Sequence, residues 1–157
     1  MPAHPQHHNS SGRMIWLHRF TIILASSTLL LLVVGGLVTS TESGLAVPDW
    51  PNTYGYFMFN FPLSQMVGGI FYEHGHRLIA SMVGFLTIIL AGWIWLVDPR
   101  RWMRRLGVIA LVTVIMQGTL GGITVLYYLP APISIAHAGL AEIFFCLTVS
   151  IALFTSS

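Results

Sequence analysis

The sequence predicts an all-α membrane protein, a bundle of four transmembrane helices with both termini in the cytoplasm. Of the 157 residues, 55% are hydrophobic and only 8% are charged, and four long apolar runs cover most of the chain. Each run reaches or exceeds the roughly 20 residues that a helix needs to cross the hydrocarbon core of a bilayer. Lipid offers no hydrogen bonds to a bare backbone, so helices are the structure expected for these runs.

The expected elements follow the apolar runs in chain order. We expect a disordered cytoplasmic tail over residues 1–14 and a transmembrane domain over residues 15–157. The first run is too long for the core of a signal peptide, so we expect it to be a retained anchor. The predicted helices span about 15–39, 77–97, 106–126 and 133–154, with an external loop over 40–72.

Arginine sets the expected orientation, because the chain has no lysine. Arg13 and Arg19 lie at the start of the first helix. The link between the second and third helices carries four more: Arg100, Arg101, Arg104 and Arg105. Basic residues are enriched on the cytoplasmic side of membrane proteins, so both regions should face the cytoplasm. The net charge of +2 therefore reflects topology and gives no support to nucleic-acid binding.

The external loop is too long for a simple connector, and loops of such length tend to be functional or disordered. Its aromatic residues favour a folded cap at the membrane surface: Trp50, Tyr54, Tyr56, Phe57, Phe59 and Phe61. An ordinary interfacial aromatic belt accounts for part of the same pattern.

The segment F-Y-E-H-G-H-R at the start of the second helix places ionisable groups at the membrane boundary. Such groups are costly there, so they indicate a functional site. With the amino terminus inside, the second and fourth helices both begin at the outer face, so His76 and His137 lie at similar depth. Two facing histidines in a four-helix bundle are a natural pair of axial ligands for heme iron.

A flat macrocycle also needs space beside its ligands. The third helix provides small residues and an amide at the expected depth, with Gln117 and Gly121 as candidate cofactor contacts and Gly118 and Gly122 beside them. Small residues at four-residue spacing also mediate helix packing without any ligand. The glycines alone favour packing, whereas the histidine pair favours a heme site.

Glu73, His76 and Arg77 stand at i, i+3 and i+4, so they should share one helical face while His74 is turned away as a spare polar residue. Glu73 is suited to orient an imidazole, relay a proton or act on a substrate. Arg77 is suited to bind a heme propionate. The alternative is an interfacial Glu–Arg pair that merely caps the helix. Glu142 lies off the face of His137, and neither it nor Glu42 receives a role.

Four motifs in order resemble the heme A synthase family, whose members convert heme O to heme A for cytochrome oxidase assembly. They are G-G-L-V-T-S-T-E-S-G-L-A-V-P-D-W-P from Gly35 to Pro51, E-H-G-H-R from Glu73 to Arg77, Q-G-T-L-G-G-I-T-V-L from Gln117 to Leu126, and I-A-H-A-G-L-A-E around His137. Together they span nearly the whole chain after the tail.

The resemblance implies a multi-pass oxidoreductase of the bacterial inner membrane. It would oxidise a methyl group of heme O to the formyl group of heme A, with water as the oxygen source. By the same resemblance, His76 and His137 are the heme ligands of the amino-terminal half, and Glu73 is the carboxylate tied to catalysis. The loop bearing Asp49 and Trp50 would cover the substrate heme on the outer side.

The chain departs from the family pattern in two respects. Val47 and Thr53 stand where many members carry a cysteine pair, which excludes a thiol-dependent step. Typical members have eight spans in two similar halves, the second holding a heme b cofactor. This chain therefore corresponds to one half, and we expect a homodimer, completion by a separate carboxy-terminal half, or no activity alone. Heme O synthase and the cytochrome oxidase assembly machinery are the expected pathway partners.

Two other readings stay open. A non-catalytic b-type heme-binding membrane subunit, or an oxidase assembly factor, would keep both histidines without a special requirement for Glu73. A structural or transport bundle without a cofactor would use the histidines in a proton or substrate pathway. The lone Cys146 is expected to be a small packing residue of the fourth helix.

Overall fold

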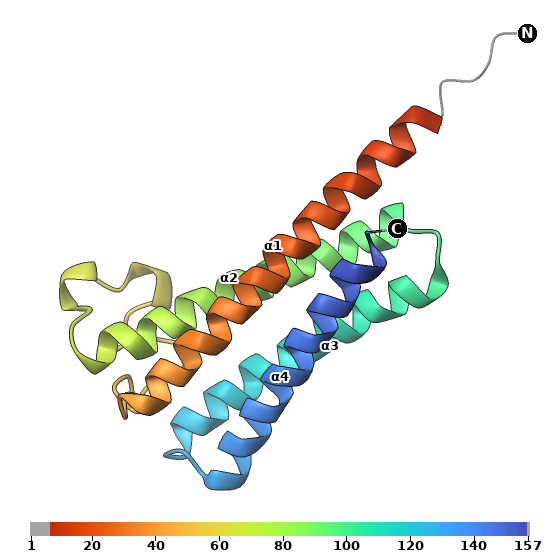
Figure 1. Ribbon diagram of the computed structural model, residues 1–157. Coiled ribbons are helices and arrows are strands. Elements are labelled where there is room, and N and C mark those ends of the chain that lie inside the picture. Colours follow the sequence, from red (N-terminus) through yellow and green to blue (C-terminus); the bar gives the residue numbers. More distant parts are fainter. Residues whose placement is uncertain (1–6, 157) are drawn as a thin grey trace, which may run out of the picture.

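The computed structural model describes residues 7–156, with side chains from residue 12 onward, and consists of four long helices that run alternately up and down (Figure 1). All four are long and apolar enough to cross a membrane. Within the described residues there is no strand, and one isolated bridge joins Thr53 to Tyr56. The prediction of an all-helical, four-span protein is confirmed. The helices are α1 (His7–Ser40), α2 (Gly69–Val97), α3 (Arg101–Leu126) and α4 (Ala131–Phe154).

All four helices begin earlier than hydropathy predicts, α4 by only two residues. α1 includes residues 7–14, part of the tail expected to be disordered; residues 1–6 of that tail lie outside the described part of the chain. α3 begins at Arg101, five residues before its apolar run. α2 begins at Gly69, eight residues before the expected start. Polar side chains in this first stretch of α2 are buried against the external loop, so their polarity does not end the helix.

The core lies between the helices, each of which packs against the next along the chain, while α4 returns against α1. Threonines share this interior, and their hydroxyl groups bond to their own helix: Thr28 to the carbonyl of Leu24 and Thr87 to that of Val83, each at 2.8 Å. These two buried hydroxyl groups are thus satisfied without a neighbouring helix. The buried apolar side chains are Leu17, Leu24, Val83, Leu90, Ile94, Met103, Ala110, Phe144 and Ile151.

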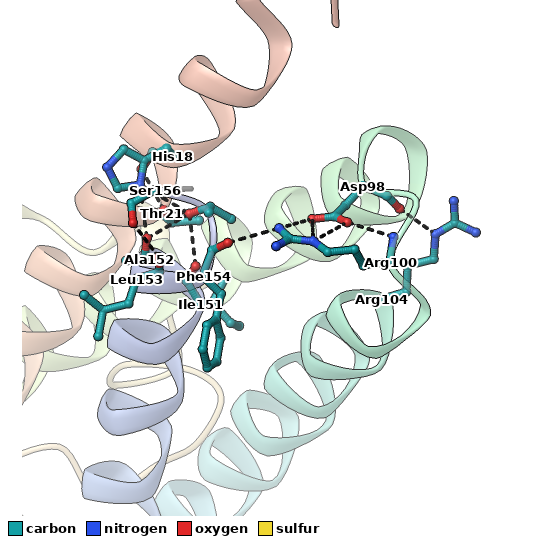
Figure 2. Close-up of polar contacts among 11 residues, drawn as sticks. His18, Thr21, Asp98, Arg100, Arg104, Ile151, Ala152, Leu153, Phe154 and Ser156 are labelled. Carbon is teal, nitrogen blue, oxygen red and sulfur yellow. Dashed lines mark hydrogen bonds and ion pairs between the residues drawn. The ribbon is translucent and has the colours of Figure 1, made fainter. Parts of the chain in front are cut away.

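The end of α4 is fastened at the arginine-rich end of the bundle (Figure 2). The Nδ1 atom of His18 lies 3.1 Å from the carbonyl oxygen of Ala152. Arg100 pairs with Asp98 at 2.8 Å and donates to the carbonyl of Phe154 at 3.0 Å. Burial acts to raise the pKa of Asp98, but hydrogen bonds from Arg100 outweigh it and hold that pKa below its usual value. Basic groups at a helix carboxyl end also complement the helix dipole.

Residues 41–68 form a folded cap at the opposite end of the bundle from both described ends of the chain (Figure 1). Two short 3₁₀ helices, Met58–Asn60 and Leu63–Gln65, give it regular structure. The carboxylate of Asp49 accepts the backbone N–H groups of Tyr54 and Gly55, both at 2.8 Å. Both of these residues have left-handed backbone conformations, so the Asp49 carboxylate fixes a turn.

Candidate functional site

Arg77 ties the cap to α2. Its Nη1 group donates to the carbonyl oxygens of Asp49 at 2.7 Å and Asn52 at 3.0 Å. Its Nη2 group donates to the carbonyl of Val47 at 2.7 Å and to the Oε1 atom of Glu73 at 2.6 Å. The Arg77 residue is only 9% exposed. Three acceptors therefore come from the cap and one from the same helix, so this guanidinium holds the cap down.

Glu73 completes this network from the same face. It is 3% exposed, and its Oε2 atom accepts the backbone N–H of Val47 at 2.7 Å. Each carboxylate oxygen therefore takes a charge-assisted hydrogen bond, the strong kind. A pair that merely caps the helix is not what the structure shows, because the Glu73–Arg77 pair is buried and bonds the backbone of the cap.

The expectation that His74 is a spare polar residue turned away from this face is wrong. His74 is 1% exposed, its Nδ1 atom lies 3.0 Å from the hydroxyl of Thr53, and its ring packs against Phe61 with centroids 5.0 Å apart. Glu73, His74 and Arg77 thus all engage the cap, whereas His76 turns toward α1. Sequence spacing cannot assign these directions, because they depend on where the cap folds back.

His76 and His137 each lie against a glycine of a neighbouring helix. A Cβ atom on Gly35 of α1 would stand 3.2 Å from the Cε1 atom of His76, and one on Gly121 of α3 would stand 3.1 Å from that of His137. The Nδ1 atom of each ring is buried and has no hydrogen-bond partner in the described structure. Each predicted ligand thus has a glycine of a neighbouring helix close to its ring and a ring nitrogen without a partner among the described residues.

Further polar atoms without partners surround His137. Gln117 donates from Nε2 to the backbone carbonyl of His137 at 2.9 Å. The Oε1 atom of Gln117 and the hydroxyl of Ser134 are buried and unpaired within the described residues. Buried polar groups without partners are uncommon in folded proteins, so their concentration around one histidine marks a place where a bound group fits.

The other two predicted residues belong to the cap. Trp50 reaches across to α3, where a Cβ on Gly122 would stand 2.5 Å from the indole Cδ2 atom. Asp49 directs its carboxylate into the turn and offers only its carbonyl to Arg77. Neither residue hydrogen-bonds to the two histidines in the described structure, and both form part of the cover over this end of the bundle.

Two residues of the site escaped the sequence reasoning. Gly35 belongs to the G-G pair near the end of α1, and no local pattern connects it with an imidazole about 40 residues later. Ser134 precedes His137 by one helical turn, which is a usable signal, since residues three apart share a helix face.

The chemistry of these donor atoms suits a heme. Among the described residues no group of three or more His, Cys, Asp or Glu is placed to hold a metal ion, whereas a porphyrin brings most of the ligands of its iron. Two histidines can supply the axial positions. The fold and site thus define a four-span helical membrane protein with a paired-histidine site beneath a folded cap.

Comparisons with known proteins agree with this class. Residues 57–149 match the family model described as cytochrome oxidase assembly protein. The chain is 33% identical over 135 residues to the heme A synthase of Shouchella clausii, covering 85% of this chain and 44% of that protein. It is 30% identical over 124 residues to the heme A synthase of Alkalihalophilus pseudofirmus, covering 78% and 40%.

The family match covers more than half of the chain, so this protein belongs to the cytochrome oxidase assembly protein family. It is a multi-pass integral membrane protein of the bacterial membrane. The chain spans less than half the length of the curated relatives described above. No solved structure matches it.

Proposed function

We propose that this chain is the heme O-binding half of a heme A synthase. The observation that carries the proposal is the histidine pair at one end of the bundle, with each ring against a glycine and each Nδ1 atom unpartnered. The names of the relatives support the assignment. His76 and His137 would hold the iron of heme O, and Gln117 and Gly121 would flank the His137 side.

Oxidation of a porphyrin methyl to a formyl group, with water as the oxygen source, releases electrons and protons that must leave the site. Glu73 is the carboxylate best placed to take a proton: the Asp49 carboxylate is committed to its turn, and Glu42 and Glu142 are exposed. The electrons need a redox carrier, and the resemblance implies a heme b in a second half or partner subunit.

Besides the heme propionate contact expected from the sequence, Arg77 has a second role in this proposal, that of a positioning residue. Its Nη groups are used by the cap and by Glu73, so a heme propionate would meet only its Nε–H. We therefore assign Arg77 mainly to holding the cap over the site, together with Trp50.

We place both termini in the cytoplasm and the cap outside, because the arginines other than Arg77 gather at the end of the bundle away from the cap.

We also propose that a second copy or a separate carboxy-terminal half packs on α4. Its outer face exposes Glu142 near the middle of the span, with Gly139 and Cys146 beside it. A carboxyl group facing lipid at that depth is costly without a partner. Within this bundle the expectation that Cys146 is a packing residue is wrong.

The test is expression with a source of heme O, purification in mild detergent and chromatography of the extracted porphyrin. We expect the wild type to retain heme O, with conversion to heme A where a redox partner accepts the electrons, and we expect loss of bound heme from His76→Ala and His137→Ala. Heme O or heme B with no heme A would refute activity of the chain alone. No Soret absorbance from correctly folded protein would refute heme binding and favour the bundle without a cofactor.

The second candidate is a non-catalytic b-type heme-binding subunit or assembly factor. One observation favours it: both oxygens of Glu73 are engaged in holding the cap, which is a structural role. Glu73→Gln separates the two functions, since a synthase loses formyl production while keeping heme, whereas a carrier keeps its heme and shows only a loosened cap. Thr53→Val is the matched control, because it removes the bond to His74 and loosens the cap without altering Glu73.

A further inference from the structure

A shallow cleft of about 530 Å³ opens at the arginine-rich end of the bundle, far from the histidine site. It lies between the end of α2 and the start of α3, where the two spans leave the membrane. Its lining combines three arginines with apolar side chains: Trp95, Arg101, Arg104, Arg105, Val108 and Ile109. Nothing in the proposed synthase function uses this place.

The described part of the chain balances the positive charge of the cleft only in part, at Arg104, which interacts with the Asp98 carboxylate. The buried Asp98 carboxylate pairs with Arg100, and Arg104 donates from Nε to the backbone carbonyl of Asp98 at 2.9 Å. Figure 2 shows Arg104 on the side of Asp98 away from α4. Arg101 and Arg105 are exposed and make no ion pair with the described residues.

Two further features favour an anion here. The first turn of α3 contains no acidic residue, and no side chain caps its N-terminus, so the positive end of the helix dipole adds to the guanidinium groups. The Arg104 guanidinium also lies over the Trp95 ring, 5.6 Å from its centroid, which fixes one wall of the cleft.

The apolar side of the cleft points to an amphiphile. Val108 and Ile109 lie one to two turns into the span from the arginines, and both are about half exposed. Positive charge at a helix end is enough to set topology, but topology does not require a hollow with basic residues at its mouth and aliphatic residues along its membrane side.

We propose that this cleft binds an anionic phospholipid from the leaflet at the arginine-rich end. The phosphodiester accepts hydrogen bonds from Arg101, Arg104 and Arg105, and an acyl chain lies along Val108 and Ile109. Basic pockets between transmembrane helices bind acidic headgroups in this way.

The test is a lipid titration of the full chain in mild detergent, with bound lipid counted by native mass spectrometry. Phosphatidylglycerol should bind with clear preference over phosphatidylcholine. The Arg101→Gln/Arg105→Gln variant should weaken phosphatidylglycerol about 30-fold, since each basic group near the surface contributes roughly fivefold. Helical circular dichroism, which the charge change should not alter, verifies that each variant folds.

The matched control is Arg13→Gln/Arg19→Gln, which removes two charges from the same end of the bundle but from α1. It should keep the lipid preference. Ile109→Trp keeps every arginine but fills the apolar side, and it should weaken the lipid without affecting inorganic phosphate. Equal loss in both arginine variants, no preference in the wild type, or phosphate binding as tight as the lipid would overturn the proposal.

Discussion

Gly35→Ala gives the sharpest test of the paired-histidine site, because the neighbouring Gly36 supplies its own control. A Cβ atom on Gly35 would stand 3.2 Å from the Cε1 atom of His76, whereas one on Gly36 meets nothing within 4 Å. Both substitutions sit in α1, where alanine improves helix propensity by about 1 kcal/mol over glycine. They therefore differ mainly in whether the new methyl group presses on the imidazole.

The size of the effect follows from this contact. At 3.2 Å the His76 ring must move by a few tenths of an ångström, which its unpartnered Nδ1 atom allows while the ring is free. An iron bond would hold the ring in place, so the strain falls on the bound state. A displaced rotamer costs about 0.5–1.5 kcal/mol, which predicts heme binding weaker by roughly twofold to tenfold. Gly121→Ala should act alike on His137, with Gly118→Ala as its control.

The assay is a heme titration of each purified variant, followed by Soret absorbance, with thermal unfolding of the heme-free protein measured in parallel. We expect Gly35→Ala and Gly121→Ala to weaken heme binding, and their double variant to weaken it by the product of the two factors. Gly36→Ala and Gly118→Ala should leave heme affinity unchanged. If Gly35→Ala binds heme as tightly as Gly36→Ala, His76 does not hold the iron in the position described.

Three further predictions concern the cap. Arg77→Met should destabilise the protein by about 3–5 kcal/mol, because it leaves the buried Glu73 carboxylate without its counter-charge, and limited proteolysis should then cut within residues 41–68. The backbone N–H groups of Tyr54 and Gly55 hold the pKa of Asp49 below its usual value of 3.8, despite the opposing effect of burial. The stability from this carboxylate is therefore present above that pH and is lost as pH falls through the lower pKa of the folded state, as thermal unfolding at stepwise lower pH would show. Gly122→Ala should displace the Trp50 indole and cost about 1–3 kcal/mol, seen as a shift in tryptophan emission.

Each of these has an outcome that contradicts it. A cap in Arg77→Met as resistant to protease as the wild type would show that the three hydrogen bonds from Arg77 to the cap do not hold it. An Asp49→Asn variant whose stability falls with acid as steeply as that of the wild type would assign the effect to another carboxyl group. Unchanged emission in Gly122→Ala would mean that the indole does not lie on α3.

Some properties of the residues near the site can be inferred from the sequence, and others cannot. The similar depth of His76 and His137 can be inferred from two helices that start at the same face, because depth in the membrane changes nearly linearly with residue number along a transmembrane helix. The partners of Glu73 and Arg77 could not be inferred, since their bonds run to backbone groups 25–30 residues away. The burial of His74 could not be inferred for the same reason, since it depends on where Phe61 and Thr53 fold back onto α2.

The amino-acid sequence by itself determined that this chain crosses the membrane four times as helices, since a bilayer forces every backbone group in an apolar run to bond within its own segment. It also determined which family motifs the chain carries. Only the tertiary structure decided that Gly35 and Gly121 make room for the two imidazoles, that the cap bonds to Glu73, His74 and Arg77, and that the arginines line a cleft. Hydropathy is a local property of the sequence, whereas these contacts join residues far apart in the chain and depend on how the helices and the cap pack together.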